Sequence, residues 1–263
     1  MKLKEELAYF RGEWTGLRLH LKAFDKKGKQ EDLHRFRVQV KKLRAFLVLA
    51  DSGVAAGQLQ KELKPVRKLF KAAGNIRNAY INLELIKLLQ PSFTEIMQDQ
   101  RSLMKRSAHD FRAGAGKHLQ RLRRAQRKLK KAIPKLNDVH IDFYYRQQLE
   151  QIAVCLAPPY ADTSLHACRK QLKMLIYNYK LVKPVLNQPF NEAYLDEVQN
   201  VIGEWHDKQV AIDLFSTGGT ENDGLVNALR KEKSKLKRQL TVLVKDFYNK
   251  ATTVNELPLE QID

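Results

Sequence analysis

The chain of 263 residues has few cysteines, a shortage of acidic residues and no long apolar run. Its two cysteines, Cys155 and Cys168, are too few for the disulfide framework of a small secreted domain, and they favour a reducing compartment. His166 lies near them in sequence, but a zinc site needs more ligands at tighter spacing, so we expect no metal and no cofactor. No stretch approaches the ~20 apolar residues of a membrane span.

The first residues, MKLKEELAYF, carry charges and contain no apolar core, so we expect no signal peptide and a soluble, cytoplasmic protein. Acidic residues number 29 against 48 Lys and Arg, which leaves a net charge of +19. Such an excess opposes compact folding by self-repulsion and is typical of proteins with an anionic partner, such as nucleic acid, a membrane surface or polyphosphate. The alternative is a basic surface that is merely solvated.

The sequence shows no alternation typical of strands, and its apolar period is helical. In the first segment the apolar residues recur at three- and four-residue steps: Leu3, Leu7, Phe10, Trp14, Leu17 and Leu21. Further helices are predicted over 32–50, 58–73, 76–90, 94–132, 138–155, 163–183, 190–202, 204–215 and 225–250, with a loop over 216–224 and a frayed tail. We expect an all-α bundle.

The helix boundaries rest on a few residue types. Gly74 is predicted to divide two helices, and Gly114 with Gly116 marks a candidate break in the 94–132 stretch. Thr163 or Ser164 is predicted to cap the helix that contains His166, because a hydroxyl can accept a bond from a free backbone N–H.

An internal repeat organises the chain. His34-Arg35-Phe36-Arg37-Val38-Gln39-Val40-Lys41 and His166-Ala167-Cys168-Arg169-Lys170-Gln171-Leu172-Lys173 share the pattern His-x-x-Arg-x-x-x-Lys. A Gly-led segment follows each histidine, at Gly74 after 40 residues and at Gly203 after 37 residues. Two ordered landmarks at near-constant spacing predict a duplicated four-helix unit within a single domain, 1–263, with halves at approximately 1–115 and 116–263.

The first copy predicts a cationic stripe on a helix. His34, Arg37, Lys41 and Arg44 fall within an arc of roughly 80°, beside an apolar arc that contains Phe36, Val40, Leu43 and Leu47. No acid occurs from Leu33 to Ala50, although a solvated face would normally mix signs. Arg offers a planar fork for phosphate and Lys a mobile point charge, so the stripe is suited to phosphate.

The second copy repeats this chemistry, and its candidate site residues are His166, Arg169, Lys170 and Lys173. A lone histidine is ordinarily a core or capping residue, but the same placement in both copies favours phosphate contact, directly or through a neighbour. A histidine at a helix start would also lie beside free backbone donors. Other candidate site residues are Lys42, Arg77, Lys208, and Arg121, Arg124 and Lys128 of the acid-free 112–136 stretch. For that stretch and for Arg230 to Arg238, a solvated face is as plausible as a binding one.

At these residues the chain resembles the CHAD family, the conserved histidine α-helical domain. Residues 34–44 follow the family's first motif throughout, and the segments that begin at Gly74 and Gly203 resemble its Gly-led motifs. There are two departures: Ile176 stands where the second motif usually has Arg, and Asn78 where the first Gly-led segment usually has Asp. The resemblance implies two pseudo-symmetric four-helix bundles around a central basic groove that binds inorganic polyphosphate without catalysis.

Several functions remain open at this point. Polyphosphate granules or a polyphosphate-metabolising enzyme are candidate partners beyond the polymer itself, and granule association would place the protein there within the cytoplasm. A nucleic-acid-binding helical protein is the alternative, although the stripes lack aromatic residues for base stacking. An enzyme is less favoured. His206-Asp207 resembles part of a metal-dependent phosphohydrolase, but the further ligands are missing, and no P-loop or paired catalytic carboxylates occur.

Overall fold

The computed structural model describes residues 1–53, 57–159, 161–216 and 223–253. These residues form eleven α-helices and one 3-10 turn, and none of them forms a strand. The all-α class is therefore confirmed. The chain divides into two compact units, Met1–Asn137 and Asp138–Asp263. The single-domain assignment and the repeat boundary near residue 115 stay predictions.

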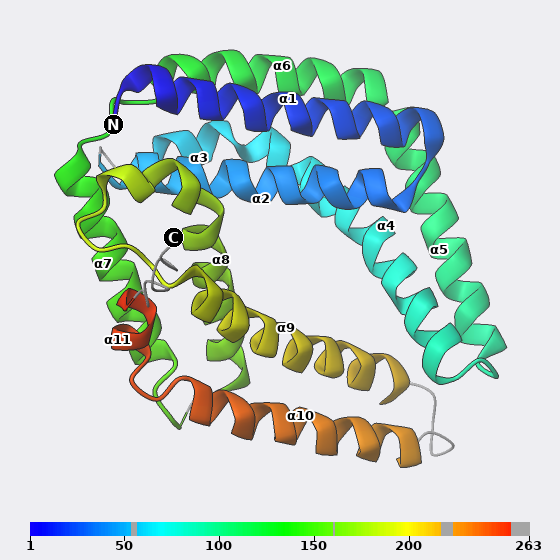
Figure 1. Ribbon diagram of the computed structural model, residues 1–263. Coiled ribbons are helices and arrows are strands. Elements are labelled where there is room, and N and C mark those ends of the chain that lie inside the picture. The colour runs from blue at the N-terminus through cyan, green and yellow to red at the C-terminus, as the bar shows by residue number, and fades with distance from the viewer. Residues whose placement is uncertain (54–56, 160, 217–222, 254–263) are drawn as a thin grey trace, which may run out of the picture. The chain divides into compact units, whose positions relative to one another are not determined.

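The first unit contains six helices (Figure 1). They are α1 (Leu3–Lys27), α2 (Gln30–Ser52), α3 (Gln58–Glu62), α4 (Lys64–Leu89), α5 (Thr94–Ala113) and α6 (Ala115–Ala132). Helix α1 packs against α2 and α6, α2 packs against α4, and α4 forms a hairpin with α5. Most of the predicted apolar stripe of α1 is buried, from Phe10 to Leu21, while Leu3 at its end is 38% exposed. The break predicted near Gly114 is confirmed.

The second unit contains five helices and the 3-10 turn, Lys183–Val185. The helices are α7 (Asp138–Cys155), α8 (Asp162–Val182), α9 (Glu192–Phe215), α10 (Asp223–Leu243) and α11 (Phe247–Thr252). Helix α8 packs against α7 and α9, and α9 forms a hairpin with α10 (Figure 1). The core includes Leu165, Leu172 and Leu175 of α8 and Trp205 of α9. No described helix is long and apolar enough to cross a membrane.

The helix breaks predicted at Gly74 and before residue 204 are wrong. Helix α4 continues through Gly74, and α9 continues through Gly203. Both glycines are buried, and an arginine side chain from a neighbouring helix occupies the space that a Cβ would fill. An isolated glycine costs a helix only about 1 kcal/mol relative to alanine, so a tertiary contact can retain it without ending the helix.

Other predicted boundaries also need correction. Helix α8 begins at Asp162 with Ala161 at the cap, so neither Thr163 nor Ser164 caps it. The single helix predicted over 225–250 ends at Leu243, because Asp246 takes a left-handed backbone conformation (φ 56°) before α11 begins. Most of the predicted 216–224 loop and the tail beyond residue 253 lie outside the described residues.

The two cysteines are paired, which the sequence did not predict. Cys155 at the end of α7 and Cys168 in α8 form a disulfide, with a Cα–Cα distance of 6.2 Å. This pairing removes the cysteine-based argument for a reducing compartment. It also attaches α8 to α7 at the residue that precedes Arg169.

Candidate functional site

The first candidate site is a group of cations on α2 and α4. We call His34, Arg37 and Lys41 of α2 together with Arg77 of α4 the first cluster. The opposite side of α2 is buried through Phe36, so the cations are confined to its outer face. Burial lowers the pKa of His34 and Arg77 lowers it further; Glu31 acts to raise it, and Lys41 and Arg37 lower it by smaller amounts. The imidazole is therefore neutral at pH 7.

Arg37 is fixed in place by three contacts. Its Nη1 donates a hydrogen bond of 2.8 Å to the Phe70 carbonyl, and its Cζ lies 4.2 Å from the centroid of the Phe70 ring. A Cβ added at Gly74 would lie 2.6 Å from Nη1, which is closer than non-bonded atoms can approach. The absence of a side chain at Gly74 thus leaves the space that Nη1 of Arg37 occupies, and the guanidinium is held against α4.

The second candidate site is the corresponding group on α8 and α9. We call His166, Arg169, Lys170 and Lys173 of α8 together with His206 of α9 the second cluster. A Cβ added at Gly203 would lie 3.2 Å from Nη2 of Arg169, so the arginine–glycine contact recurs with more room. Arg169 Nε is buried without a hydrogen-bond partner among the described residues. A buried guanidinium nitrogen without a partner is uncommon, because buried donors are normally hydrogen-bonded.

His206 is a site residue that the sequence argument did not select. Its ring centroid lies 4.8 Å from that of His166. Burial lowers the pKa of both rings, and Lys170 and Arg169 lower that of His166 further. For His206, Arg169 adds to the lowering, whereas Asp207 and Asp213 act to raise the pKa. His206 stands three residues after Gly203, as Arg77 stands three residues after Gly74. That shared offset was the signal that could have identified it.

Carboxylates surround the two clusters differently. In the second cluster, burial and Arg169 lower the pKa of Lys173, whereas Asp207 and Asp196 act to raise it. Near the first cluster, Glu31 is the carboxylate that acts to raise the pKa of His34. Its charge is shared with Arg35, with which it forms an ion pair of 2.8 Å. The second cluster is therefore the less cationic of the two.

Both histidines lie further inside their helices than predicted. His34 is the fifth residue of α2 and His166 is the fifth residue of α8, so neither lies beside the free N–H groups of a helix start. Glu31, Asp32 and Asp162 occupy the first turns instead. Carboxylates are favoured at this end of the helix dipole, which explains why the helices extend beyond the histidines.

The remaining predicted residues do not gather at the clusters. Lys42 interacts with Glu13, and Arg44 is exposed further along α2. Lys208 forms an ion pair with Glu232 on α10.

The predicted residues of α6 lie elsewhere in the first unit. Lys128 pairs with Glu62 at 3.2 Å, Arg124 is exposed, and Arg121 lines a separate cleft. Their predicted role in polyphosphate binding stays untested.

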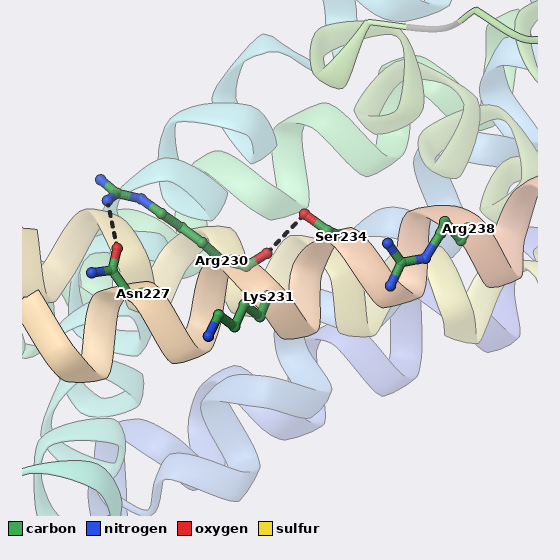
Figure 2. Close-up of a pocket in the computed structure, with 5 residues that line it drawn as sticks. All are labelled: Asn227, Arg230, Lys231, Ser234 and Arg238. Carbon is green, nitrogen blue, oxygen red and sulfur yellow. Dashed lines mark hydrogen bonds between the residues drawn. The ribbon is translucent and has the colours of Figure 1, made fainter.

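Helix α10 carries a further cationic surface. A shallow cavity of about 420 Å³ is lined by Asn227, Arg230, Lys231, Ser234 and Arg238 (Figure 2). Arg230 donates to the Asn227 side chain at 3.2 Å, and the Ser234 hydroxyl donates to the Arg230 carbonyl at 2.9 Å. On the neighbouring side of α10, Lys233 and Lys237 both form ion pairs with Asp162.

No group of three or more His, Cys, Asp or Glu side chains suited to hold a metal ion occurs within the described ranges.

The CHAD domain profile matches residues 7–216, and the chain belongs to the CHAD domain family. Among solved structures, it is similar to the crystal structure of the CHAD domain from the plant Ricinus communis. The TM-score is 0.62 at 18% identity, over 94% of this chain and 89% of that chain. No curated protein matches the sequence.

Proposed function

We propose that the protein binds inorganic polyphosphate without catalysis, through the first and second clusters. The observation that carries the proposal is the arginine–glycine contact found in each unit, Arg37 with Gly74 and Arg169 with Gly203. Each contact fixes a guanidinium near a histidine and further cations. Fixed guanidinium groups bind phosphate oxygens with two parallel hydrogen bonds and lose little side-chain entropy on binding.

A chain of phosphates suits the clusters better than nucleic acid does. Single-stranded nucleic acid is bound by aromatic rings on which bases stack. The rings beside the first cluster are covered by cations, since Arg37 lies over Phe70 and Arg77 lies 5.0 Å from the centroid of Tyr80. The cluster therefore offers charge and hydrogen-bond donors rather than stacking surfaces, which favours a ligand made of phosphate alone.

A phosphohydrolase built on His206 and Asp207 is disfavoured by the same charges. The His206 ring packs against that of His166 at a tilt, and Arg169 makes the largest charge contribution to its lowered pKa, against Asp207 and Asp213, which raise it. Cations that disfavour a proton on the ring also disfavour a divalent metal there. The second cluster is thus better suited to hold an anion than to activate water on a metal.

The proposal extends to a ligand long enough to reach both clusters. The predicted pseudo-symmetric bundles and central groove would allow one long polyphosphate chain to engage both clusters. The two contributions would then combine through effective concentration, and affinity would rise with chain length. Association with polyphosphate granules or a polyphosphate-metabolising enzyme, in the cytoplasm, remains a further part of the proposal.

The ligand class is tested by titrating the protein with long-chain polyphosphate, duplex DNA and single-stranded RNA at physiological salt and at two higher concentrations. We expect a clear preference for polyphosphate, with affinity that falls steeply as salt rises, because bound phosphates release counterions. Equal affinities for the three polymers would overturn the assignment to polyphosphate and leave a general polyanion binder.

A further inference from the structure

A second cationic site lies in the first unit, in a cleft of about 510 Å³ between α3, α4 and α6. We call it the α6 cleft. Its lining consists of Lys61, Glu62, Lys64, Pro65, Lys68, Leu69, Ala72, His118 and Arg121. Sites for small organic ligands commonly have volumes of roughly 300–1,000 Å³, so the cleft has room for such a molecule.

The α6 cleft is separate from the first cluster. Successive residues of a helix are rotated by about 100°, so residues two positions apart face nearly opposite directions. On α4, Phe70 and Gly74 contact Arg37, whereas Lys68 and Ala72 line the cleft. The two sites therefore lie on opposite sides of α4, and a ligand in one does not occupy the other.

The rim of the cleft is strongly cationic. Lys61, Lys64, Lys68 and Arg121 come from three helices, and all four are exposed. The one carboxylate in the lining, Glu62, forms an ion pair with Lys128 on α6. Its charge is thereby offset, and the rim presents four cations to an incoming ligand, which is enough for more than one phosphate group.

The floor of the cleft is apolar. Leu69 is buried, and Pro65 and Ala72 are half-buried beside it. The His118 ring packs on Phe111, with 5.2 Å between centroids. Burial lowers the pKa of His118, against a backbone hydrogen bond with Phe111 that raises it, so the ring is neutral at pH 7.

From the cationic rim and this floor we infer that the α6 cleft binds an organic phosphate whose charged groups are attached to a flat apolar body, with nucleoside di- and triphosphates as the matching class. An inorganic phosphate chain would use the rim alone and leave the floor in contact with water. A nucleotide covers both, and its base buries apolar surface against the half-buried Pro65 and Ala72.

The inference is tested on the full chain with ATP that carries a methylanthraniloyl fluorophore as the probe. Unlabelled ATP, inorganic tripolyphosphate and adenosine then compete for the site. We expect ATP to displace the probe at a concentration at least about tenfold below that of tripolyphosphate or adenosine, because only ATP engages both rim and floor. Displacement by tripolyphosphate as effective as that by ATP would overturn the inference.

The variants locate the site. Lys68→Ala with Arg121→Ala removes two rim cations and is expected to weaken ATP binding at least about tenfold, because charged hydrogen bonds to phosphate are lost. Arg123→Ala, an exposed change on α6 outside the cleft, is the control and should leave ATP binding unchanged. Loss of ATP binding in Arg37→Ala, with retention in the rim variant, would place the nucleotide at the first cluster and overturn the inference.

The same variants separate this inference from the proposed function. The rim variant is expected to keep its polyphosphate affinity, and Arg37→Ala is expected to keep its ATP affinity. Helical circular dichroism and thermal unfolding of each variant show that the fold is intact. Absence of ATP binding to the wild-type chain contradicts the cleft inference alone, and absence of polyphosphate binding contradicts the proposed function alone.

Discussion

The first and second clusters share one contact and differ in the charges around it. In both, an arginine three residues after a histidine lies against a glycine of the next long helix. The first cluster adds Arg77 at the third position after its glycine, whereas the second adds His206 there. Asp207 and Asp196 also oppose the positive charges of the second cluster. The guanidinium position is thus common to both units, while the strength and pH response of each cluster are set by its neighbours.

We expect the largest difference between the two clusters when one arginine is removed at a time. Arg37→Ala deletes a guanidinium from the more cationic cluster and is expected to weaken polyphosphate binding by about 10- to 100-fold, which corresponds to 1.5–3 kcal/mol for charged hydrogen bonds. Arg169→Ala should cost less, because Asp207 and Asp196 already weaken the second cluster. Isothermal titration calorimetry with polyphosphate of one defined length measures both, and a larger loss in Arg169→Ala would contradict the ranking.

The two glycines provide the next test. Gly74→Ala places a Cβ where Nη1 of Arg37 lies, so the guanidinium must move from the Phe70 carbonyl. We expect polyphosphate affinity to fall about tenfold. Thermal stability should change little, since the gain of up to about 1 kcal/mol from alanine in a helix offsets the loss of the hydrogen bond to Phe70.

Gly203→Ala meets a guanidinium at 3.2 Å rather than 2.6 Å, and its effect on binding should be smaller. Fluorescence titration and a thermal melt of each variant separate affinity from stability. If Gly74→Ala lost stability and affinity together, the glycine would serve packing rather than the arginine.

The histidines should give the two clusters different pH responses. In the free protein, burial and nearby cations hold the pKa of His34, His166 and His206 below about 6.5. A bound polyanion favours the protonated rings, so binding takes up protons and affinity should rise as pH falls. Without ligand the sign reverses: the folded state resists protonation, so stability declines as pH drops below the unfolded value.

The predicted rise in affinity is checked by measuring polyphosphate binding from pH 7.5 to 5.5. We expect about a tenfold rise, because raising the pKa of one histidine by one unit on binding strengthens binding to the protonated form by a factor of ten. The double variant His166→Gln/His206→Gln should flatten the profile more than His34→Gln, because the second cluster contains two of the three rings. An affinity independent of pH in the wild-type chain would exclude the histidines from the binding site.

The smallest expected effect comes from exchanging the residues that follow Arg77 and His206. Asp207→Asn removes a carboxylate near Lys173 and should tighten binding, whereas Asn78→Asp adds one to the first cluster and should weaken it. Each change is expected to be about two- to fivefold, the range of a single exposed charge pair. Competition assays resolve such differences. If both variants changed polyphosphate affinity in the same direction, the two positions would not face corresponding clusters.

The sequence predicted the cationic face of α2 well, because charge and helical period together determine which residues share a face. It failed at Gly74 and Gly203, where glycine was read as a local helix break. The cause is a guanidinium from another helix, and a single sequence does not show which side chain approaches a glycine. The pairing of Cys155 with Cys168 was missed for the same reason, since it depends on a Cα–Cα distance of 6.2 Å set by tertiary packing.

Charge alone also failed to assign a face to α6. Ten basic residues lie between Phe111 and Asn137, but Arg121 lines the α6 cleft while Lys128 pairs with Glu62. Both outcomes depend on α3 and α4, whose position beside α6 is not encoded in the local pattern. Repetition was the more reliable signal, because the offset shared by Arg77 and His206 identifies one residue whose charge acts on His34 and one whose ring packs against His166.

The most direct test is a polyphosphate titration of the double variant Arg37→Ala/Arg169→Ala. Lys22→Ala/Lys235→Ala serves as a control that removes two exposed cations outside the clusters. We predict an affinity loss of at least about 100-fold in the first variant, from two charge-assisted contacts, and less than about fivefold in the control. Unchanged affinity in the double variant, with its helical circular dichroism intact, would contradict the assignment of polyphosphate to these clusters.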